Sequence, residues 1–408
     1  MGVGVFIDFL IEALNLTRTE ISTAYMIGTI GSSLILPYAG RILDQIGSRK
    51  MVVISSLGLA GGLILLSQTD HLVQLVNKGS FFVTMIVISS GFLFVRFFGQ
   101  GCLGMISRVN IGKWFNHRRG LATAIMGVFG SFGFNSSPIL LNILIENLGW
   151  RFAYLFLAIL IGLGMSLLGW IFYRDNPEQC SLVMDGITEK NRLKNITAKI
   201  PDTKKDFTRG EAARTLVFWA FSIGLAIVGL IITAITFHIA SLGNEFGLSR
   251  TEAYAVFWPM AFFSVGANFF SSWISDKIRL KWLLIAMMAA QFVSLTGLLN
   301  FNHLLGRAIF IACQGSAGGM FVALSVVVMP RYFGRKHLGA ISGLFASIMV
   351  LGTALGPVLF STFHNITGDY KAVIWGCFIL PLSIMLAGLK AENPQLKIKV
   401  ESKSSLGK

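Results

Sequence analysis

The stretch Gly40–Lys50, which reads G-R-I-L-D-Q-I-G-S-R-K, joins two long apolar segments at residues 21–39 and 51–67. A short basic turn between two apolar segments predicts two membrane-spanning helices whose connection lies on the cytoplasmic side. Asp44 is unexpected in this turn, because the preference for positive charge on the cytoplasmic side concerns only lysine and arginine. The carboxylate therefore needs a separate structural or functional reason.

The composition is that of a helical membrane protein. Of the 408 residues, 54% are hydrophobic and 13% are charged, and the charged fraction is about half that of a soluble protein. Apolar runs of about 20 residues recur along the chain, whereas the alternating ten-residue segments of a membrane barrel do not. We therefore predict an all-α polytopic membrane protein that contacts lipid along most of its length.

The net charge of +15 raises the question of a nucleic-acid partner. In the predicted topology, 26 of the 34 lysines and arginines lie in loops on one side, six on the other and two within the membrane. This asymmetry explains the basic charge without a polyanionic partner. We expect no nucleic-acid binding, and we expect a monomer in the cytoplasmic membrane with its central loop and C-terminus in the cytoplasm.

Metal and catalytic chemistry have no support in the sequence. The four cysteines are isolated from one another, and the six histidines form no cluster with metal-ligand spacing. A membrane enzyme would need catalytic groups gathered near one interface, and no such group of histidines, cysteines, serines or acids exists. We expect no cofactor, no metal and no enzymatic activity.

Eleven full spans and part of a twelfth are expected. Residues 1–7 resemble the end of a span, because a full span needs about 20 apolar residues and Asp8 and Glu12 follow at once. We expect the first helix to be incomplete, with roughly 18 or more preceding residues in the natural chain; a protein of eleven and a half helices is the alternative. The full spans are 20–40, 51–68, 81–111, 121–145, 151–173, 215–240, 252–274, 282–301, 304–330, 339–363 and 371–390.

An internal repeat divides the chain into two halves. L-T-R-T-E at 16–20 recurs as L-S-R-T-E at 248–252, an offset of 232 at which Asp44 also matches Asp276. Later residues match at an offset of 218–219, as Pro138 does with Pro357. A parallel duplication of six helices follows. The expected units are a six-helix bundle at 1–173, a cytoplasmic linker at 174–214, a second six-helix bundle at 215–390 and a cytoplasmic tail at 391–408.

Both copies of the repeat begin with a helix-capping signal. Thr17 with Glu20 and Ser249 with Glu252 have the spacing of a capping box, and Thr208 with Glu211 has the same spacing in the linker. We expect little other structure in the linker.

Six plus six helices, a long central loop and the turn G-x-x-x-D-x-x-G-x-[R/K]-[R/K] together resemble the major facilitator superfamily. Gly40, Asp44, Gly47, Arg49 and Lys50 fit the turn, whereas Gln45 and Ser48 depart from it. The second copy keeps Asp276 but lacks both glycines. The resemblance implies a secondary transporter in which two bundles rock about a central site.

Several stretches are similar to the monocarboxylate-transporter and oxalate/formate-antiporter branch of this superfamily. They include R-F-F-G-Q-G at 96–101, W-F-N-H-R-R-G-L-A from Trp114 and P-R-Y-F-G-R-K-H-L-G-A-I from Pro330. Antiporters of this branch hold a dicarboxylate between an arginine in the eighth helix and a lysine in the eleventh. Here 252–274 has no arginine or lysine and 339–363 has no lysine, so a dianion is not expected.

Arg96 is the strongest candidate for substrate binding or proton coupling. It lies near the middle of the fourth span, where a charge costs at least ~2.5–3.5 kcal/mol and therefore faces a cavity or a partner. Gln100 lies on the same face one turn later, and a guanidinium with an amide suits a carboxylate. The alternative is a structural arginine bonded to carbonyls or to a neighbouring helix.

Five weaker candidates each have a structural alternative. Asp8 is a protonation site or part of a solvated helix end, and His238 is a proton-coupling group or a tolerated histidine at a helix end. The amides line the cavity or form interhelical hydrogen bonds, and Gln314 aligns with Arg96 under the repeat. The amide candidates are Asn135, Asn268 and Gln314.

The turn 40–50 is predicted to be a gate. Asp44 is expected to approach the N-terminal end of the eleventh span near 338–340, where a carboxylate gains roughly 0.3–1 kcal/mol. Arg41 or Arg49 could add an ion pair. The predicted substrate is a small organic anion, a monocarboxylate moved with protons. The alternatives are export of a drug-like or other metabolite and a non-transporting membrane sensor.

Overall fold

The computed structural model describes residues 2–77, 80–116, 118–186 and 204–397, and every regular element in these ranges is a helix. The segments η1 and η2 are π-helical, and η3, η4 and η5 are short 3₁₀ turns. The elements of the first half and the start of the linker are α1 (Gly2–Leu14), α2 (Arg18–Ser67), α3 (Thr69–Asn77), α4 (Phe81–Phe94), η1 (Val95–Leu103), α5 (Gly104–Trp114), α6 (Arg119–Leu148), α7 (Trp150–Ile159), η2 (Leu160–Met165), α8 (Ser166–Phe172), η3 (Pro177–Cys180) and η4 (Met184–Gly186). The remaining elements are α10 (Arg209–Ala213), α11 (Leu216–Glu245), α12 (Arg250–Ala255), α13 (Phe257–Ser275), α14 (Leu280–Leu299), α15 (Leu304–Phe333), α16 (Leu338–Thr367), α17 (Lys371–Cys377), α18 (Ile379–Lys390) and η5 (Pro394–Lys397).

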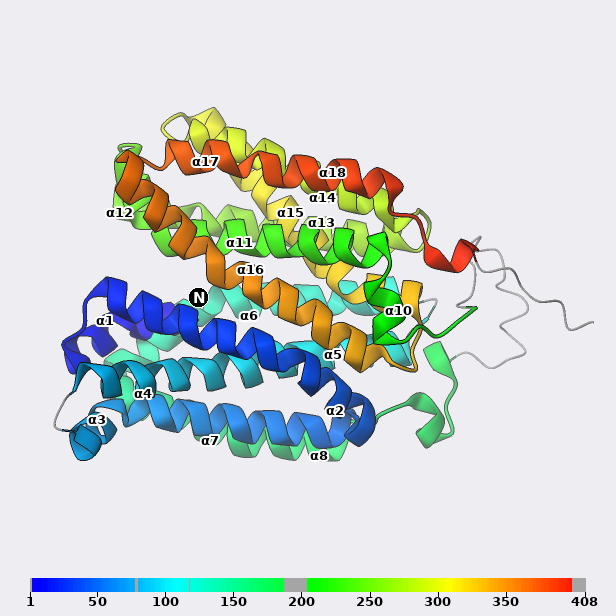
Figure 1. Ribbon diagram of the computed structural model, residues 1–408, viewed down its shortest axis with the longest axis horizontal. Helices are drawn as coiled ribbons and strands as arrows, with labels where there is room; N and C mark the ends of the chain where they lie inside the picture. Colours follow the sequence, from blue (N-terminus) through cyan, green and yellow to red (C-terminus); the bar gives the residue numbers. More distant parts are fainter. Residues whose placement is uncertain (1, 78–79, 117, 187–203, 398–408) are drawn as a thin grey trace, which may run out of the picture.

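The long helices lie side by side, with the first half of the chain below the second in Figure 1. We call the end that carries residues 174–186 and 204–214 the linker end, at the right of Figure 1, and the opposite end the far end. Across the boundary between the halves, α2 packs against α16 and α6 packs against α13. These two pairs of helices make the largest part of the contact between the halves, and α5 adds to it by packing against α15 and α16.

The hydrophobic packing differs between the two ends of the molecule. One core cluster joins residues of both halves, among them Leu43 and Val109 with Leu338 and Phe345. A second cluster, around Phe6, Leu63, Phe92 and Tyr154, has its buried residues in the first half alone. Since the shared cluster includes the start of α16, the halves are packed together at the linker end.

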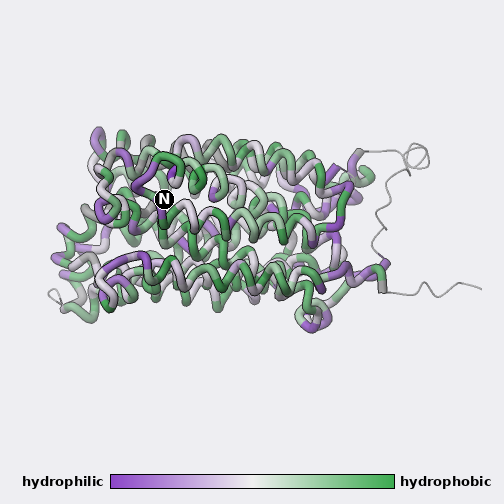
Figure 2. The backbone as a smooth tube through the Cα atoms, turned by 90° about the horizontal axis from the view of Figure 1, so that it is seen from above, coloured by the Kyte–Doolittle hydropathy of each residue, from purple (hydrophilic) through white to green (hydrophobic). Residues whose placement is uncertain are grey.

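Hydropathy follows the length of the helices. Hydrophilic residues gather toward the two ends of the molecule in Figure 2, and hydrophobic residues predominate between them. Eight helical segments among the described residues are long and apolar enough to cross a membrane. These eight segments are fewer than the eleven predicted spans. One reason is that Thr19–Ser67 is a single helical segment that contains two predicted spans.

The quoted turn at 40–50 is shorter than the sequence suggested. The chain stays helical through almost all of it, and Gly47 alone leaves helical geometry, with φ of 84°. Glycine adopts this left-handed region without a steric penalty. A β-carbon at Gly47 would also lie 2.4 Å from the carboxyl carbon of Asp175. The turn therefore needs glycine for its conformation and for its close approach to the linker.

The three predicted capping boxes are confirmed. Thr17 with Glu20 opens α2, and Thr208 with Glu211 opens α10, each with both reciprocal hydrogen bonds. Ser249 and Glu252 make the same pair of bonds before α12, at 2.9 and 3.3 Å. The two copies of the repeat therefore begin with the same local structure.

Candidate transport site and gate

Arg96 lies in the middle of the helical run 81–114 and reaches across the boundary between the halves. Its Nη2 donates to Thr353 Oγ1 of α16 at 2.7 Å, and its Nη1 donates to Gln100 Oε1. The guanidinium carbon lies 5.2 Å from the centre of the Tyr25 ring of α2, a cation–π distance. Arg96 therefore has partners in both halves, and the predicted pairing with Gln100 is present.

The charge of Arg96 has no acidic partner within the described part of the chain. Its described partners are an amide, a hydroxyl and an aromatic ring. Nε is buried and makes no hydrogen bond to any described group. A cation held at mid-membrane by neutral groups retains the capacity to bind an anion.

A π-helical segment presents this side chain. The run η1 covers Val95–Leu103, so both Arg96 and Gln100 lie within it. A π-helical turn contains more residues than an α-helical turn and occurs often at functional sites. R-F-F-G-Q-G fits an ordinary helix equally well, so no sequence pattern predicts the π-helical segment.

Two of the predicted amides have structural roles. Gln314 of α15 is 1% exposed, and its Oε1 accepts from Gln291 and Ser294 of α14 at 2.8 and 3.1 Å. Asn268 of α13 is fully buried, and its Nδ2 donates to the Ala124 carbonyl of α6 at 3.3 Å. Both amides therefore form hydrogen bonds between helices, which was the alternative to lining a cavity. Gln314 aligns with Arg96 under the repeat but does not contact it. The side chains of Asp8 and Asn135 lie outside the described residues.

His238 lies near the far end of α11 in a polar cluster. Its Nε2 is 3.0 Å from the Pro357 carbonyl oxygen of α16, and its Nδ1 is 3.4 Å from the Tyr370 hydroxyl. The neighbouring Phe237 ring lies 6.3 Å from that of Tyr25, which in turn lies beside Arg96. Aromatic packing thus connects His238 with the surroundings of Arg96.

Asp44 contacts the N-terminus of α16, where the sequence placed it. Its Oδ1 accepts from Gly339 N–H at 2.8 Å, and its Oδ2 accepts from Ala340 N–H at 2.7 Å. Both amides belong to the first turn of the helix, which has no intrahelical acceptors for them. We call this contact the first latch; it joins α2 of the first half to α16 of the second.

Asp276 makes the equivalent contact with α6. Its carboxylate lies against Gly120, where a β-carbon would be 2.8 Å from Asp276 Oδ2, and the charges of Arg119 and Arg331 also act on it. Gly120 and Gly339 are equivalent in the repeat, 219 residues apart. We call this contact the second latch; it joins α13 of the second half to α6 of the first.

The other residues of the turn 40–50 do not bind the N-terminal amides of α16 as Asp44 does. Gly40 provides the close approach to α16, because a β-carbon there would lie 2.2 Å from the Gly339 carbonyl oxygen. Arg49 donates from Nε to the Trp170 carbonyl at 2.6 Å, and Arg41 lies over the Tyr38 ring at 5.8 Å. The expected ion pair of Arg41 or Arg49 with Asp44 is therefore wrong. Lys50 is exposed.

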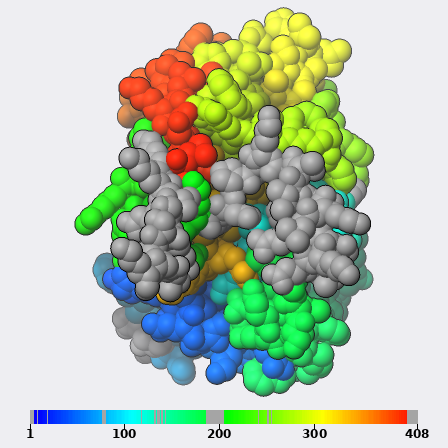
Figure 3. Space-filling model, turned by 90° about the vertical axis from the view of Figure 1, so that its right-hand side faces the viewer, coloured from blue at the N-terminus to red at the C-terminus, as the bar shows by residue number. Residues whose placement is uncertain are grey.

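The linker contains more structure than the sequence predicted. Asp185 accepts from the backbone N–H groups of Asn116 and Arg118, just before α6, at 3.0 and 3.1 Å. Asp206 accepts from those of Arg335 and Lys336, just before α16, at 2.7 and 3.1 Å. The described linker segments lie on opposite sides of the linker end in Figure 3. Each helix that receives a latch is thus preceded by a turn bound to a linker carboxylate, which no sequence pattern indicated.

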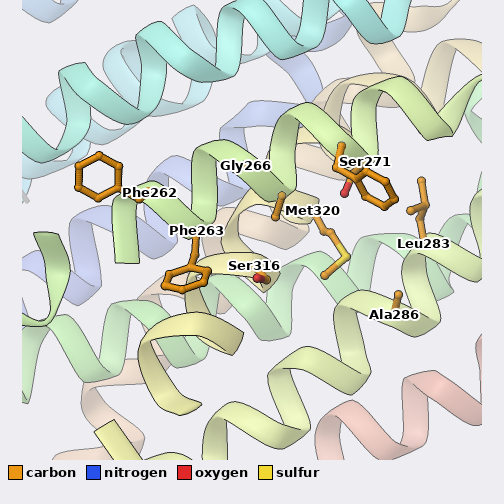
Figure 4. A pocket seen from close by; sticks show the side chains of 10 residues that line it. Phe262, Phe263, Gly266, Ser271, Leu283, Ala286, Ser316 and Met320 are labelled. Carbon is orange, nitrogen blue, oxygen red and sulfur yellow. The ribbon is translucent and has the colours of Figure 1, made fainter. Parts of the chain in front are cut away.

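A groove of about 610 Å³ lies on the second half, between α13, α14 and α15. Phe262, Phe263 and Ser271 line it from α13, Leu283 from α14, and Met320 from α15 (Figure 4). The lining is almost wholly apolar and includes none of the predicted site residues. An organic anion would find no charged partner in this groove.

The fold and these sites agree with the comparisons with known proteins. The family model described as Major Facilitator Superfamily matches residues 1–306 and 221–406. The chain belongs to the major facilitator superfamily. It is accordingly a multi-pass membrane protein of a transporter family, and the first latch lies on the turn that suggested this family in the sequence.

Two relatives show where in the superfamily the similarity lies. The chain is 23% identical over 351 residues to the uncharacterized MFS-type transporter YhjX of Escherichia coli, covering 83% of this chain and 77% of the relative. It is 26% identical over 306 residues to human monocarboxylate transporter 11, covering 70% of this chain and 59% of the relative.

Two solved structures of other proteins have the same fold as this chain. A bacterial homologue of the iron transporter ferroportin in an outward-facing state has a TM-score of 0.68 and 14% identity, over 95% of this chain and 94% of that one. The transporter FucP in an outward conformation has a TM-score of 0.66 and 14% identity, over 96% and 94%. At these identities the likeness concerns the fold alone.

Proposed function

We propose that this protein is a secondary transporter of a small organic anion, a monocarboxylate, and that it works by alternating access with proton coupling. The observation that carries the proposal is Arg96, a mid-membrane cation between the halves whose described partners are all neutral. Similarity to a monocarboxylate transporter supports the same substrate class.

The charge distribution favours a monoanion over a dianion. The helices 252–274 and 339–363 supply no second lysine or arginine to the middle of the second half. A single guanidinium can neutralise one carboxylate by a bidentate pair, and a second carboxylate would be left unpaired in a medium of low polarity. Uptake of one proton with one monocarboxylate is electroneutral and so is not opposed by the membrane potential.

In this proposal the linker end faces the cytoplasm, and the structure represents the state closed on that side. The shared core cluster and both latches join the halves at the linker end. A substrate on Arg96 would reach the cytoplasm only after both latches open. Thr353 bonds Arg96 from α16, the helix that the first latch holds, so substrate binding and gating act on one helix.

Counterflow of labelled monocarboxylates of two to six carbons into proteoliposomes tests the proposal. A hydrogen bond to a charged group contributes about 1.5–3 kcal/mol, so Arg96→Gln should reduce counterflow about tenfold to a hundredfold. Arg96→Lys keeps the charge but loses the paired donors of the guanidinium, so it should retain part of the counterflow. Arg214→Gln, an exposed linker arginine, is the control.

Either of two results would refute this assignment. Wild-type protein that moves no monocarboxylate at any pH between 5 and 8 would exclude the substrate class. Export of a drug-like compound by the same preparation would then identify the alternative function. Undiminished counterflow in Arg96→Gln, with Arg214→Gln as reference, would show that Arg96 is structural.

A further inference from the structure

A cluster of titratable groups at the far end of the second half has no role in the latches. It comprises His238 and Glu245 of α11, His364 of α16 and Tyr370, the residue before α17. The Tyr370 ring stacks on His364 with centroids 4.3 Å apart, and its N–H donates to the Glu245 carboxylate at 3.1 Å. His364 Nε2 lies 3.8 Å from Glu245 Oε2. Three helices therefore meet at this cluster.

The hydrogen bonds of His238 fix which nitrogen can take up a proton. Nε2 faces the Pro357 carbonyl oxygen at 3.0 Å, and a carbonyl only accepts, so Nε2 carries a hydrogen in the neutral ring. Nδ1 then holds the free lone pair, and the Tyr370 hydroxyl lies 3.4 Å from it. A proton added to the ring would bind at Nδ1.

Tyr370 suits both protonation states of His238. When the ring is neutral, the hydroxyl can donate to Nδ1. When Nδ1 is protonated, the hydroxyl can accept from it and donate to Ser241 Oγ, which lies 3.2 Å away. A hydroxyl rotates at small cost, so protonation leaves neither ring nitrogen without a partner in this cluster.

Helix α16 connects this histidine with Arg96. Thr353, which accepts from Arg96, and Pro357, whose carbonyl faces His238, are one turn apart on α16. Pro357 has no N–H, so the helix lacks one internal hydrogen bond at this turn and can bend there. A second connection runs through the packed rings of Phe237 and Tyr25.

The more exposed members of the cluster lie between His238 and the far end. The side chains of His364 and Glu245 are 34% and 22% exposed. A charged His364 would disfavour a proton on His238, whereas Glu245 would favour it. The Lys371 ammonium of α17 lies over the Phe246 ring, 6.0 Å from its centre. Protons from the far side would thus reach the cluster first at His364 and Glu245.

We propose that His238, paired with Tyr370, takes up the coupling proton from the far side, and that the Thr353–Pro357 turn of α16 transmits its charge state to Arg96. The proton adds to the Nδ1 lone pair and leaves from the same atom, so no other bond changes. This inference rests on the proposed anion–proton symport and names its proton site.

The first experiment compares two transport modes in the same proteoliposomes. Uphill uptake driven by a pH gradient requires net proton movement, whereas counterflow at equal pH does not. In His238→Gln, which cannot be protonated, the ratio of uphill uptake to counterflow should fall at least tenfold. Tyr370→Phe should shift the pH profile of uphill uptake, and His303→Gln, an exposed histidine at the same end, should keep the wild-type ratio.

The second experiment needs no substrate. The His238 ring is titrated by nuclear magnetic resonance in nanodiscs that contain protein with labelled histidine, assigned by loss of its signal in His238→Gln. The ring should titrate between pH 5 and 8, and both Tyr370→Phe and Arg96→Gln should move the midpoint.

The outcomes of the two experiments separate this inference from the proposed function. An unchanged transport ratio in His238→Gln, or a ring that does not titrate in this range, would overturn the proton site. A midpoint that is unaffected by Arg96→Gln would overturn the transmission through α16. Wild-type protein without carboxylate transport would refute the proposed function and this coupling role together, whereas a normal titration would still identify His238 as a proton-binding group.

Discussion

The two latches are equivalent in the repeat and differ in construction. In the first, Asp44 binds two backbone amides of α16, and glycines lie on both helices, at Gly40 and Gly339. In the second, Asp276 lies against Gly120 of α6, and Ser272 stands at the position equivalent to Gly40. The contact is present in both halves, although the second has Ser272 where the first has Gly40. One carboxylate and one glycine are therefore enough for this helix crossing.

The surroundings of the two carboxylates also differ. Arg119 and Arg331 lie near Asp276; Arg119 is buried and Arg331 is half-buried. Asp44 has both carboxylate oxygens on backbone amides, and the charges of Lys113 and His337 also act on it. Basic groups thus act on both carboxylates, and the first latch differs by its two hydrogen bonds to backbone amides. The predictions below test this distinction.

The largest effect is expected when a larger side chain replaces a glycine at the point where helices of the two halves cross. A β-carbon at Gly120 would lie 2.2 Å from the Ser272 carbonyl oxygen, and one at Gly339 would lie 2.6 Å from that of Gly40. Valine at either position should destabilise the closed linker end by about 1–3 kcal/mol, the usual cost of overpacking. Distances between spin labels at the exposed Lys50 and Lys336, on a cysteine-free background, should then lengthen. Gly61→Val, where a β-carbon meets no atom within 4 Å, serves as the control.

The second-largest effect is expected from Asp44→Asn. An asparagine has one acceptor oxygen, so one of the two amides of α16 would face its NH₂ group and lose its bond. The loss of one such bond is worth about 0.5–1.5 kcal/mol, which predicts transport slowed about two- to tenfold at near-normal membrane levels. The exposed neighbour Gln45, changed to alanine, should transport normally. Uptake equal to wild type in Asp44→Asn would show that this latch does not limit the cycle.

The linker carboxylates should have a smaller and more symmetric effect. Asp185→Ala and Asp206→Ala each remove the acceptor of a turn that precedes a latch helix. The loss of a capping side chain costs about 0.5–2 kcal/mol. We expect similar decreases in thermal stability for the two variants, measured by unfolding in detergent. A large difference between them would mean that the linker supports one latch only.

The smallest effect is expected from Asp276→Asn. Asparagine has nearly the same shape and can keep the place of the carboxylate beside Gly120, and burial raises the pKa of Asp276 above its ordinary value. The folded protein therefore binds this proton at a higher pH than the unfolded chain does, and wild type gains stability relative to Asp276→Asn as the pH falls through the raised pKa. The difference in unfolding temperature measured from pH 7 to pH 4 checks the sign. A stability loss above about 1 kcal/mol at pH 7 would show that Arg119 and Arg331 need the charge.

Much of the fold could be read from local patterns. Apolar runs, turn residues and capping boxes such as Thr17 with Glu20 depend on neighbours in the chain, and these features are present in the structure. The contact of Asp44 with residues 339–340 was also predicted, because the resemblance to the superfamily and the predicted topology place both at cytoplasmic helix ends. Failures occurred where a side chain chooses among distant partners: Gln314 bonds α14, and Arg49 bonds Trp170.

The sequence by itself determined an all-helical membrane protein built from two similar halves, with Asp44 of the first half aimed at a helix N-terminus and Asp276 as its repeat equivalent. Hydrophobic length, charge asymmetry and internal repetition are properties of the chain, so they need no coordinates. Tertiary structure alone decided that Arg96 meets Thr353 and Tyr25, that His238 faces Pro357, and that linker acids bind the turns before α6 and α16. These contacts join residues far apart in sequence, and packing between helices selects them from many partners of similar chemistry.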